Sequence, residues 1–275
     1  STKDFTFNLS VNLAHNKSIV DELADGVNRI YFNGDPNMPV KVGAVPGGKL
    51  GEIYANNLMK RDAAGNVIIG TNGLPMTETG NGNLEQYLLD HPLGNIQPDL
   101  LMSVTPSFKW KNLSFSAMFD MKFGGDIVSV SEGMATKNGL SERTAYRGEF
   151  KELNGIKDYY MVVPGVKEDG SVNDIPVSAQ RYYSTIGLYK SESGYAEEFV
   201  HDASYIKLKE LSVGYTLPKK WLSKTPFTNL RASFVARNLC YLMKHCPGNP
   251  EGGYDTSMFS QALDFLAVPY TRTYG

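Results

Sequence analysis

Apolar and polar residues alternate strictly near the start of the chain, a pattern typical of a β-strand with one wet face. In residues 5–13 every odd position is apolar and every even position is polar. A helix, with about 3.6 residues per turn, would mix the two classes around its surface. The sequence therefore predicts a strand over residues 5–13.

Two further alternating runs, residues 101–110 and 113–123, are separated only by Lys111 and Asn112. This spacing predicts a β-hairpin with a two-residue turn. Pro106 removes one donor from the ladder and is expected to mark a bulge. The turn makes both apolar faces coincide, because it pairs residue 110 with 113, 108 with 115, 104 with 119 and 102 with 121.

A third pair of strands is predicted at residues 205–217 and 230–239, joined by the link 218–229. Odd positions are apolar in the second half of the first strand, and even positions are apolar in its partner. Upstream of Lys209 and Glu210 the phase of the first strand is reversed. This reversal predicts either a bulge or a membrane boundary at that point.

Long and short connections alternate along the chain. Residues 14–100 and 124–204 are long connections, whereas 111–112 and 218–229 are short ones. Outer-membrane barrels alternate in this way, with short periplasmic turns and long extracellular loops. A strand of about 11 residues tilted by ~40° rises roughly 28 Å, which matches the ~25 Å apolar band of such barrels.

Aromatic side chains gather near the short connections. Trp110, Tyr215 and Trp221 stand at the predicted short-turn ends, where an interfacial aromatic girdle would lie. The long connections are instead rich in Gly, Asn, Asp and Pro, which form turns. Short strands are expected within them at Gly51–Asn56 and Val67–Gly70.

Composition excludes some classes of protein. The 275-residue chain has a formal net charge of −2 and a pI near 6.1, so it offers no basic field for nucleic acid. No run of ~18 apolar residues is present, which excludes a transmembrane helix but allows membrane strands. Residues 1–5 lack the features of a signal peptide, so either the protein is cytosolic or residue 1 is not its true start.

We find no constellation of residues that predicts a catalytic, metal or cofactor site. The histidines are scattered, and none stands in a metal or catalytic-triad spacing. Cys240 and Cys246 form either a loop disulfide or two free thiols, and both interpretations stay open. His245 beside them is too little for a closed zinc site, which needs about four ligands. We expect a protein that is not an enzyme and uses no cofactor.

Several short motifs follow one another along the chain: GNIQPD at 94–99, FGGD at 123–126, DASYIKLKELSVGYTLP at 202–218, ARNL at 236–239, NPE at 249–251 and PYTRTYG at 269–275. Together they resemble the C-terminal part of the SusC/RagA-type TonB-dependent transporters. Segment 202–218 is the most specific of them. Because the motifs keep their order, the resemblance covers essentially the whole chain.

This resemblance implies an all-β fold, a partial antiparallel transmembrane β-barrel. Residues 1–275 would form the C-terminal portion of a roughly 22-stranded receptor barrel, without the plug domain. Residues 14–100 and 124–204 would be its long extracellular loops. In the family a last strand continues past the Arg-Thr-Tyr-Gly position, so this final strand is expected to be missing after Gly275.

The resemblance also implies nutrient import across the cell outer membrane of a Gram-negative bacterium. Such transporters work with a SusD-like lipoprotein lid and draw energy from the TonB–ExbB–ExbD system through an N-terminal part. Their cargo is an oligosaccharide or a peptide. The expected partners are therefore the lid, the TonB system, the substrate and the lipid bilayer, with no nucleic acid.

The same interpretation assigns environments to individual side chains, although substrate-binding residues stay unknown. On the polar face, contacts with the plug are favoured over direct contacts with substrate for Ser103, Asp120, Lys122, Arg231 and Arg237. In the second long loop, the aromatic rings that could stack on sugars or touch the lid are Tyr159, Tyr160, Tyr182, Tyr183 and Tyr195.

A soluble all-β module on the cell surface, binding glycans or acting as an adhesin, is the alternative. In such a module a second sheet would cover Leu113, Phe115, Phe119 and Phe123. In a barrel these side chains would contact lipid instead. The environment of these four side chains therefore discriminates between the two classes.

Overall fold

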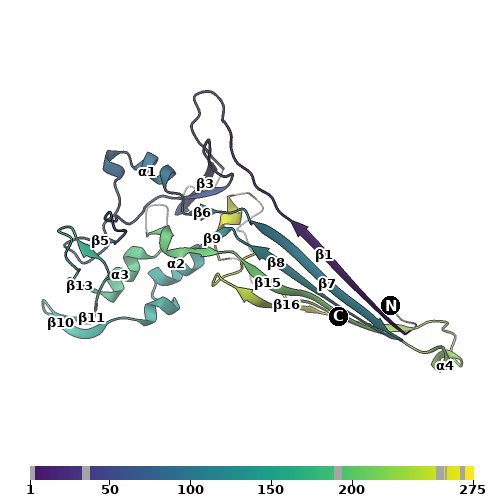
Figure 1. Ribbon diagram of the computed structural model, residues 1–275. Coiled ribbons are helices and arrows are strands. Elements are labelled where there is room, and N and C mark those ends of the chain that lie inside the picture. Colours follow the sequence, from purple (N-terminus) through teal and green to yellow (C-terminus); the bar gives the residue numbers. More distant parts are fainter. Residues whose placement is uncertain (1–3, 33–37, 189–193, 252–256, 258, 267–269) are drawn as a thin grey trace.

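The computed structural model of the protein describes residues 4–32, 38–188, 194–251, 257, 259–266 and 270–275. The chain has two parts, a long antiparallel sheet and a packed body of short strands and helices at one end of it (Figure 1). We call the packed body the cap. It is built from the described residues of segments 15–99, 124–204 and 245–266.

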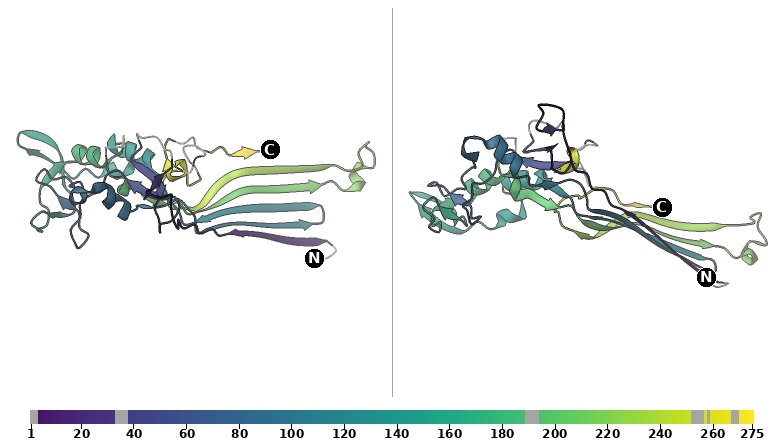
Figure 2. Two further views of the ribbon diagram at one scale, coloured as in Figure 1. Left: turned by 90° about the horizontal axis from the view of Figure 1, so that it is seen from above. Right: turned by 45° about the horizontal axis from the view of Figure 1, so that its top comes forward.

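The long sheet is a single layer in which every pair of neighbouring strands is antiparallel (Figure 2). It is not closed, because its first and last strands form two separate edges. In spatial order the strands are β1 (Phe5–Ala14), β7 (Leu100–Trp110), β8 (Leu113–Phe123), β15 (Tyr205–Thr216), β16 (Arg231–Lys244) and β18 (Thr273–Tyr274).

The hairpin of β7 and β8 has the predicted register. Trp110 pairs with Leu113, and all four expected pairs are confirmed. The expected bulge at Pro106 is wrong, since the same register continues on both sides of it. The β7–β8 ladder merely lapses at Thr105 and Pro106, because proline has no N–H group to donate.

A bulge does occur where the phase of the sequence reverses. The register of β15 shifts between Leu208 and Glu210 against both of its neighbours, so Lys209 is the extra residue relative to β8. Opposite this point β16 contains Asn238 with a φ of 54°, a left-handed value that asparagine tolerates well. The prediction near Lys209 and Glu210 is therefore confirmed as a bulge.

One face of the long sheet is apolar across five strands. A single row of paired residues runs from β1 to β16 and consists of Phe7, Phe108, Phe115, Val213 and Phe234. The rings of Phe108 and Phe115 stack with their centres 5.0 Å apart. At the two sides of this row Phe7 is 53% exposed and Phe234 is 49% exposed.

The face is not covered in the way that a soluble sandwich requires. Leu113, Phe115, Phe119 and Phe123 are only partly buried, and none of them belongs to a hydrophobic core cluster of the described residues. The other described sheets are formed by cap strands. In the described part of the chain, no second sheet therefore lies over this apolar face (Figure 2).

The cap contains many short strands. The expected strands near Gly51–Asn56 and Val67–Gly70 are confirmed as two of them, β4 (Glu52–Ala55) and β5 (Ile68–Ile69). The remaining strands of the cap are β2 (Ile30–Tyr31), β3 (Val40–Ala44), β6 (Gly94–Asn95), β9 (Asp126–Ser129), β10 (Glu149–Leu153), β11 (Ile156–Val162), β12 (Val166–Lys167), β13 (Pro176–Ser178), β14 (Val200–Asp202) and β17 (Leu263–Asp264).

Short helices complete the cap and were not predicted. Ser129 caps α2 (Val130–Lys137) by accepting a 3.3 Å hydrogen bond from the backbone N–H of Glu132, and Ser178 caps α3 (Ala179–Ile186) similarly. The other helices and turns are α1 (Leu84–Asp90), η1 (Gly80–Gly82), η2 (Glu142–Ala145), η3 (Ala196–Phe199), η4 (Ser260–Ala262) and, in the link 218–229, α4 (Lys219–Leu222). None of the helices in the described residues is long and apolar enough to cross a membrane.

The main hydrophobic core of the cap draws on three separate segments of sequence. Val40 and Ile53 come from the first long connection, Val128 and Phe199 from the second, and Leu263 from the region after β16. All five side chains are at most 1% exposed. The long connections are therefore packed against each other rather than independent.

Candidate functional site

Four of the five predicted side chains on the polar face of the sheet form hydrogen bonds with other strands of the sheet. Asp120 accepts hydrogen bonds from Lys209 at 2.9 Å and from the Tyr205 hydroxyl at 3.3 Å. Ser103 accepts one from Asn12 at 3.2 Å.

The two arginines of this face are also bonded. Arg231 donates to Ser114 at 2.8 Å, and the Nε of Arg237 lies 2.9 Å from the carboxylate of Glu210. Lys122 lies on the same face, paired with Tyr205 of β15. The polar groups of this face are thus partly engaged within the long sheet, which leaves fewer of them free for a ligand.

A cage around Lys207 lies on this polar face, next to the cap. Its ammonium group pairs with the Glu251 carboxylate and lies 4.1 Å from the centre of the Tyr270 ring and 5.3 Å from that of Tyr241. Only 3% of the Lys207 side chain is exposed. The opposite charge of Glu251 and the two aromatic rings offset the free-energy cost of removing the ammonium group from water.

The cage joins three of the motifs that carry the family resemblance. Lys207 belongs to segment 202–218, Glu251 to the NPE motif and Tyr270 to the terminal motif. The hydroxyl of Tyr241 lies 2.7 Å from Glu251 and 2.7 Å from Asn249, the first residue of NPE. This site was not predicted from the sequence. The only signal for it in the sequence was that all three motifs occur in one chain.

The tyrosines predicted as ligand contacts divide by burial. Tyr160, Tyr183 and Tyr195 are buried, and each hydroxyl is within hydrogen-bond distance of at least one backbone carbonyl oxygen of the cap. Tyr182 packs edge-on against Tyr183, and burial raises the pKa of Tyr182 to about 12. Tyr159 is 43% exposed and is the one of the five in the exposed class, since Tyr182 is only partly exposed.

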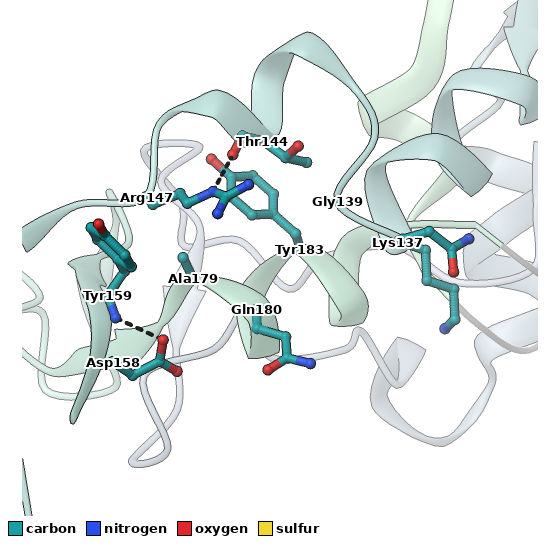
Figure 3. Close-up of a pocket in the computed structure, with 10 residues that line it drawn as sticks. Lys137, Gly139, Thr144, Arg147, Asp158, Tyr159, Ala179, Gln180 and Tyr183 are labelled. Atoms are coloured by element: carbon teal, nitrogen blue, oxygen red, sulfur yellow. Dashed lines mark hydrogen bonds between the residues drawn. The ribbon is translucent and has the colours of Figure 1, made fainter. Parts of the chain in front are cut away.

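A polar pocket of about 480 Å³ lies beside Tyr159 in the cap. Figure 3 shows Arg147, Asp158, Tyr159 and Gln180 around an open space, with Ala179 behind it. The Nε of Arg147 donates to the Thr144 carbonyl at 3.4 Å, while Asp158 accepts a 2.7 Å bond from the Tyr159 amide. The pocket therefore combines a ring face with hydrogen-bond donors and acceptors, a combination that suits a polar ligand.

A charged cluster in the cap lies around Glu132. This carboxylate is 2.7 Å from the Nε2 of His201 and 3.3 Å from the Nε of Arg143. Arg143 also pairs with Glu198 at 3.3 Å and lies over the Phe199 ring at 4.8 Å. The hydrogen bond from His201, together with the charge of Arg143, outweighs burial and lowers the pKa of Glu132 below its ordinary value.

The two cysteines near His245 form no disulfide. Cys240 and Cys246 are both free thiols, and burial raises the pKa of Cys246. The Nδ1 of His245 lies 2.6 Å from a carboxylate oxygen of Asp202 instead. Across the residues that the structure describes, no group of three or more His, Cys, Asp and Glu side chains is arranged to hold a metal ion.

The chain is similar to known proteins in sequence and in fold. No protein-family model matches the chain. TonB-dependent receptor P3 of Formosa agariphila is 23% identical over 290 residues, which cover 100% of this chain and 26% of that protein. TonB-dependent receptor SusC of Bacteroides thetaiotaomicron is 23% identical over 282 residues, which cover 96% of this chain and 24% of SusC. The chain thus spans about a quarter of the length of the relatives it matches.

Solved structures agree with the sequence relatives. The structure of the RagAB peptide transporter superposes with a TM-score of 0.58 and 19% identity, covering 100% of this chain and 27% of that chain. The RagAB peptide importer in the "closed-closed" state gives a TM-score of 0.58 at 20% identity. The resemblance to the C-terminal part of SusC/RagA-type TonB-dependent receptors is therefore confirmed, and the fold matches part of their barrel.

Proposed function

We propose that this chain forms part of the barrel wall and the outer loops of a transporter that imports oligosaccharides or peptides across the outer membrane. One observation carries the proposal. The long sheet has a continuous, partly exposed apolar face, while its other face carries hydrogen-bonded charges. A wall between lipid and a hydrated interior requires this division.

The ends of the sheet support the proposed membrane orientation. Trp110, Tyr215 and Trp221 are 54%, 40% and 66% exposed, and all three lie at the end where the short turns are. Exposed tryptophan and tyrosine are favoured where a membrane meets water. The short-turn end would accordingly face the periplasm, and the cap would face the outside of the cell.

The proposed partners follow from the relatives. The sequence relatives are named TonB-dependent receptors, and the similar solved structure is that of the RagAB peptide transporter. We therefore infer that the protein works with a SusD-like lipoprotein lid and with the TonB–ExbB–ExbD system. We also infer that it is a transporter rather than an enzyme, since its relatives are receptors and importers.

Tyr159 is the substrate contact that we propose within the cap. Its exposed ring borders the pocket in Figure 3 together with Arg147 and Asp158. An aromatic face and paired polar groups could hold one unit of an incoming oligosaccharide or peptide. Replacing Tyr159 by Ala is expected to lower uptake of the cargo without lowering the amount of folded protein in the membrane.

Accessibility of single cysteines along β8 tests the membrane placement. The full-length protein, with Cys240 and Cys246 replaced by Ser, would carry a spin label at each position from 114 to 121 in turn. Odd positions, including Phe115 and Phe119, should be reached by oxygen dissolved in lipid. Even positions should be reached by a water-soluble nickel reagent. Equal accessibility at all positions, or recovery of the protein without detergent, would refute the proposal.

A further inference from the structure

A pocket of about 530 Å³ lies beside the Lys207 cage, where the long sheet meets the cap. The end of β16 contributes Tyr241 and Lys244 to its lining, and the residues around β17 contribute Asp264 and Leu266. The loop 247–249 and Tyr270 of the terminal segment complete it. A volume of this size is typical of sites that hold small organic ligands.

The pocket borders the polar face of the long sheet. Lys207 of β15 pairs with Tyr241 on one side and with Asp120 on the other. Residues directly opposite each other in an antiparallel sheet share a face, so Tyr241 lies on the same face as Asp120. This is the face that we propose lines the hydrated interior. A ligand in the pocket would therefore lie between the cap and that interior.

Asp264 brings an incompletely bonded carboxylate to the pocket. The residue is only 5% exposed. Its Oδ2 accepts a 2.9 Å hydrogen bond from the Ser129 hydroxyl. Its Oδ1 has no partner among the described residues and is not sealed from solvent. Because buried polar groups are normally hydrogen-bonded, Oδ1 is an acceptor that a ligand can satisfy.

The same lining contains donors without a partner. Within the part of the chain that the structure describes, neither the Tyr270 hydroxyl nor the side-chain N–H groups of Asn249 form a hydrogen bond. The Lys244 ammonium group is different, because it donates to two carbonyl oxygens of the following loop at 2.9 and 3.1 Å. Its charge stands beside the charge of Asp264, so the lining carries no excess of either sign.

Leu266 borders the pocket in an unfavourable backbone conformation. Its φ is 46°, a left-handed value that is rare for leucine, and its side chain is 65% exposed. Its backbone N–H donates to the Ser131 hydroxyl at 2.7 Å. Backbone strain of this kind persists where the surrounding structure imposes it, and it is concentrated at ligand sites. The Leu266 side chain and the rings of Tyr241 and Tyr270 form the apolar part of the lining.

We propose that this pocket binds one neutral sugar unit of the cargo as the cargo passes from the cap to the interior. A sugar ring carries hydroxyl groups on its edge and C–H groups on its faces. Its hydroxyls would donate to Asp264 and accept from Tyr270 and Asn249, while a C–H face would lie against the apolar lining. Balanced charge suits a neutral ligand. The proposal rests on the proposed function and narrows its cargo to an oligosaccharide.

Native mass spectrometry of the full-length protein in non-ionic detergent tests this proposal. One probe is a mixture of neutral tetrasaccharides of glucose, galactose, mannose or xylose, and the other is a mixture of neutral tetrapeptides at the same concentration. Every sample carries Tyr159→Ala, so that the pocket beside Tyr159 contributes little. This parent variant should bind the tetrasaccharides.

Asp264→Asn should weaken tetrasaccharide binding about tenfold, the loss expected for one hydrogen bond to a charged group. The asparagine oxygen can keep the bond from Ser129, but the side chain then presents N–H groups to the pocket in place of Oδ1. Tetrapeptide binding, if any, should not change by more than about twofold.

Leu266→Gly separates a ligand contact from a structural role. Glycine adopts the left-handed conformation freely, so the variant should unfold at a higher urea concentration than its parent. It should nevertheless bind the tetrasaccharides about threefold or more weakly, because an apolar contact is lost. Leu140→Gly is the matched control, since Leu140 is an 81% exposed leucine elsewhere in the cap. It should bind the tetrasaccharides within about twofold of the parent.

Three outcomes would overturn the proposal. These are no tetrasaccharide binding by the parent variant, equal tetrasaccharide binding by the parent and both pocket variants, and an equal loss of tetrapeptide binding in those variants, which would indicate a peptide site. Heat-dependent gel mobility shows which variants are folded, and Leu266→Gly decides if Asp264→Asn is not. A protein recovered without detergent would instead refute the membrane placement, which separates the two failures.

Discussion

The ammonium group of Lys207 lies 4.1 Å from the centre of the Tyr270 ring, although the two residues are far apart in the sequence. The same group pairs with Glu251, so β15, the NPE motif and the terminal segment meet at one side chain. Only 3% of the Lys207 side chain is exposed, and these contacts replace the water that its ammonium group has lost. The cage is therefore a point at which the cap is held to the long sheet.

Replacing Lys207 by Met should loosen this fastening. The change leaves the Glu251 carboxylate without its cation, and we expect a loss of about 2–3 kcal/mol in the free energy of unfolding of the full-length protein. Limited proteolysis should then cut faster within residues 245–251. The double variant K207M/E251M should recover part of the loss. K209M is the control, because Lys209 is 43% exposed and its removal should cost less than about 1 kcal/mol. Equal effects of K207M and K209M would contradict this prediction.

Charge on the apolar face should be costly, and charge on the polar face should not. Phe119 lies on the apolar face and pairs with Val104, whereas Met118 lies on the polar face and pairs with Glu210. Phe119→Lys should lower stability by about 2–4 kcal/mol near the middle of a membrane. Met118→Lys should change it by less than about 1 kcal/mol, since the new cation faces Glu210. Urea unfolding in lipid vesicles measures both, and a reversed order would exclude the proposed orientation.

The turn between β7 and β8 stores backbone strain at Lys111. Its φ is 51°, a left-handed value that costs most residues about 1–2 kcal/mol but costs glycine nothing. Lys111→Gly should therefore raise the free energy of unfolding by up to about 1 kcal/mol. Lys111→Val should lower it, because a β-branched side chain tolerates this conformation worst. Urea unfolding of both variants checks the sign, and stabilisation by valine would show that the turn adopts another conformation.

The Glu132 cluster should make the cap sensitive to acid. The His201 hydrogen bond and the Arg143 charge lower the pKa of Glu132 in the folded protein below its ordinary value of 4.5. A lowered folded pKa contributes stability above the unfolded pKa, and this contribution is lost as the pH falls through the folded value. Proteolysis within residues 124–204 should therefore accelerate below about pH 4.5.

Glu132→Gln should flatten that dependence. It should also reduce stability at pH 7 by on the order of 1 kcal/mol, since the charge that faces His201 and Arg143 is lost. Glu142→Gln, on the exposed neighbouring turn η2, is the matched control and should leave the pH profile unchanged. If the control and Glu132→Gln gave the same profile, the cluster would not be the source of the acid sensitivity.

The long sheet could be predicted from the sequence because two constraints agree there. Alternation determines which side chains share a face, and the two-residue turn at Lys111 and Asn112 determines the register. The bulge at Lys209 was visible as a change of phase. The bulge predicted at Pro106 was wrong, because the sequence does not show whether a proline only removes one hydrogen-bond donor or also marks an inserted residue.

The cap could not be predicted in the same way. Its helices are at most 8 residues long, too short for helical periodicity to stand out from turns rich in glycine. The Ser129–Glu132 spacing does match a capping box and could have indicated α2. The burial of individual tyrosines in the cap could not be predicted either. Tyr159 and Tyr160 are adjacent in sequence, but Tyr159 is exposed and Tyr160 is buried.

In the proposed transporter, the shared core of the cap would restrict how cargo preference can change. Val40, Phe199 and Leu263 come from three segments but fill one interior. A chimera that exchanges a single loop with a relative would replace only some of these contacts and leave the others mismatched. New specificity is therefore expected to arise from substitutions on the surface of the cap, or from exchange of all three segments together.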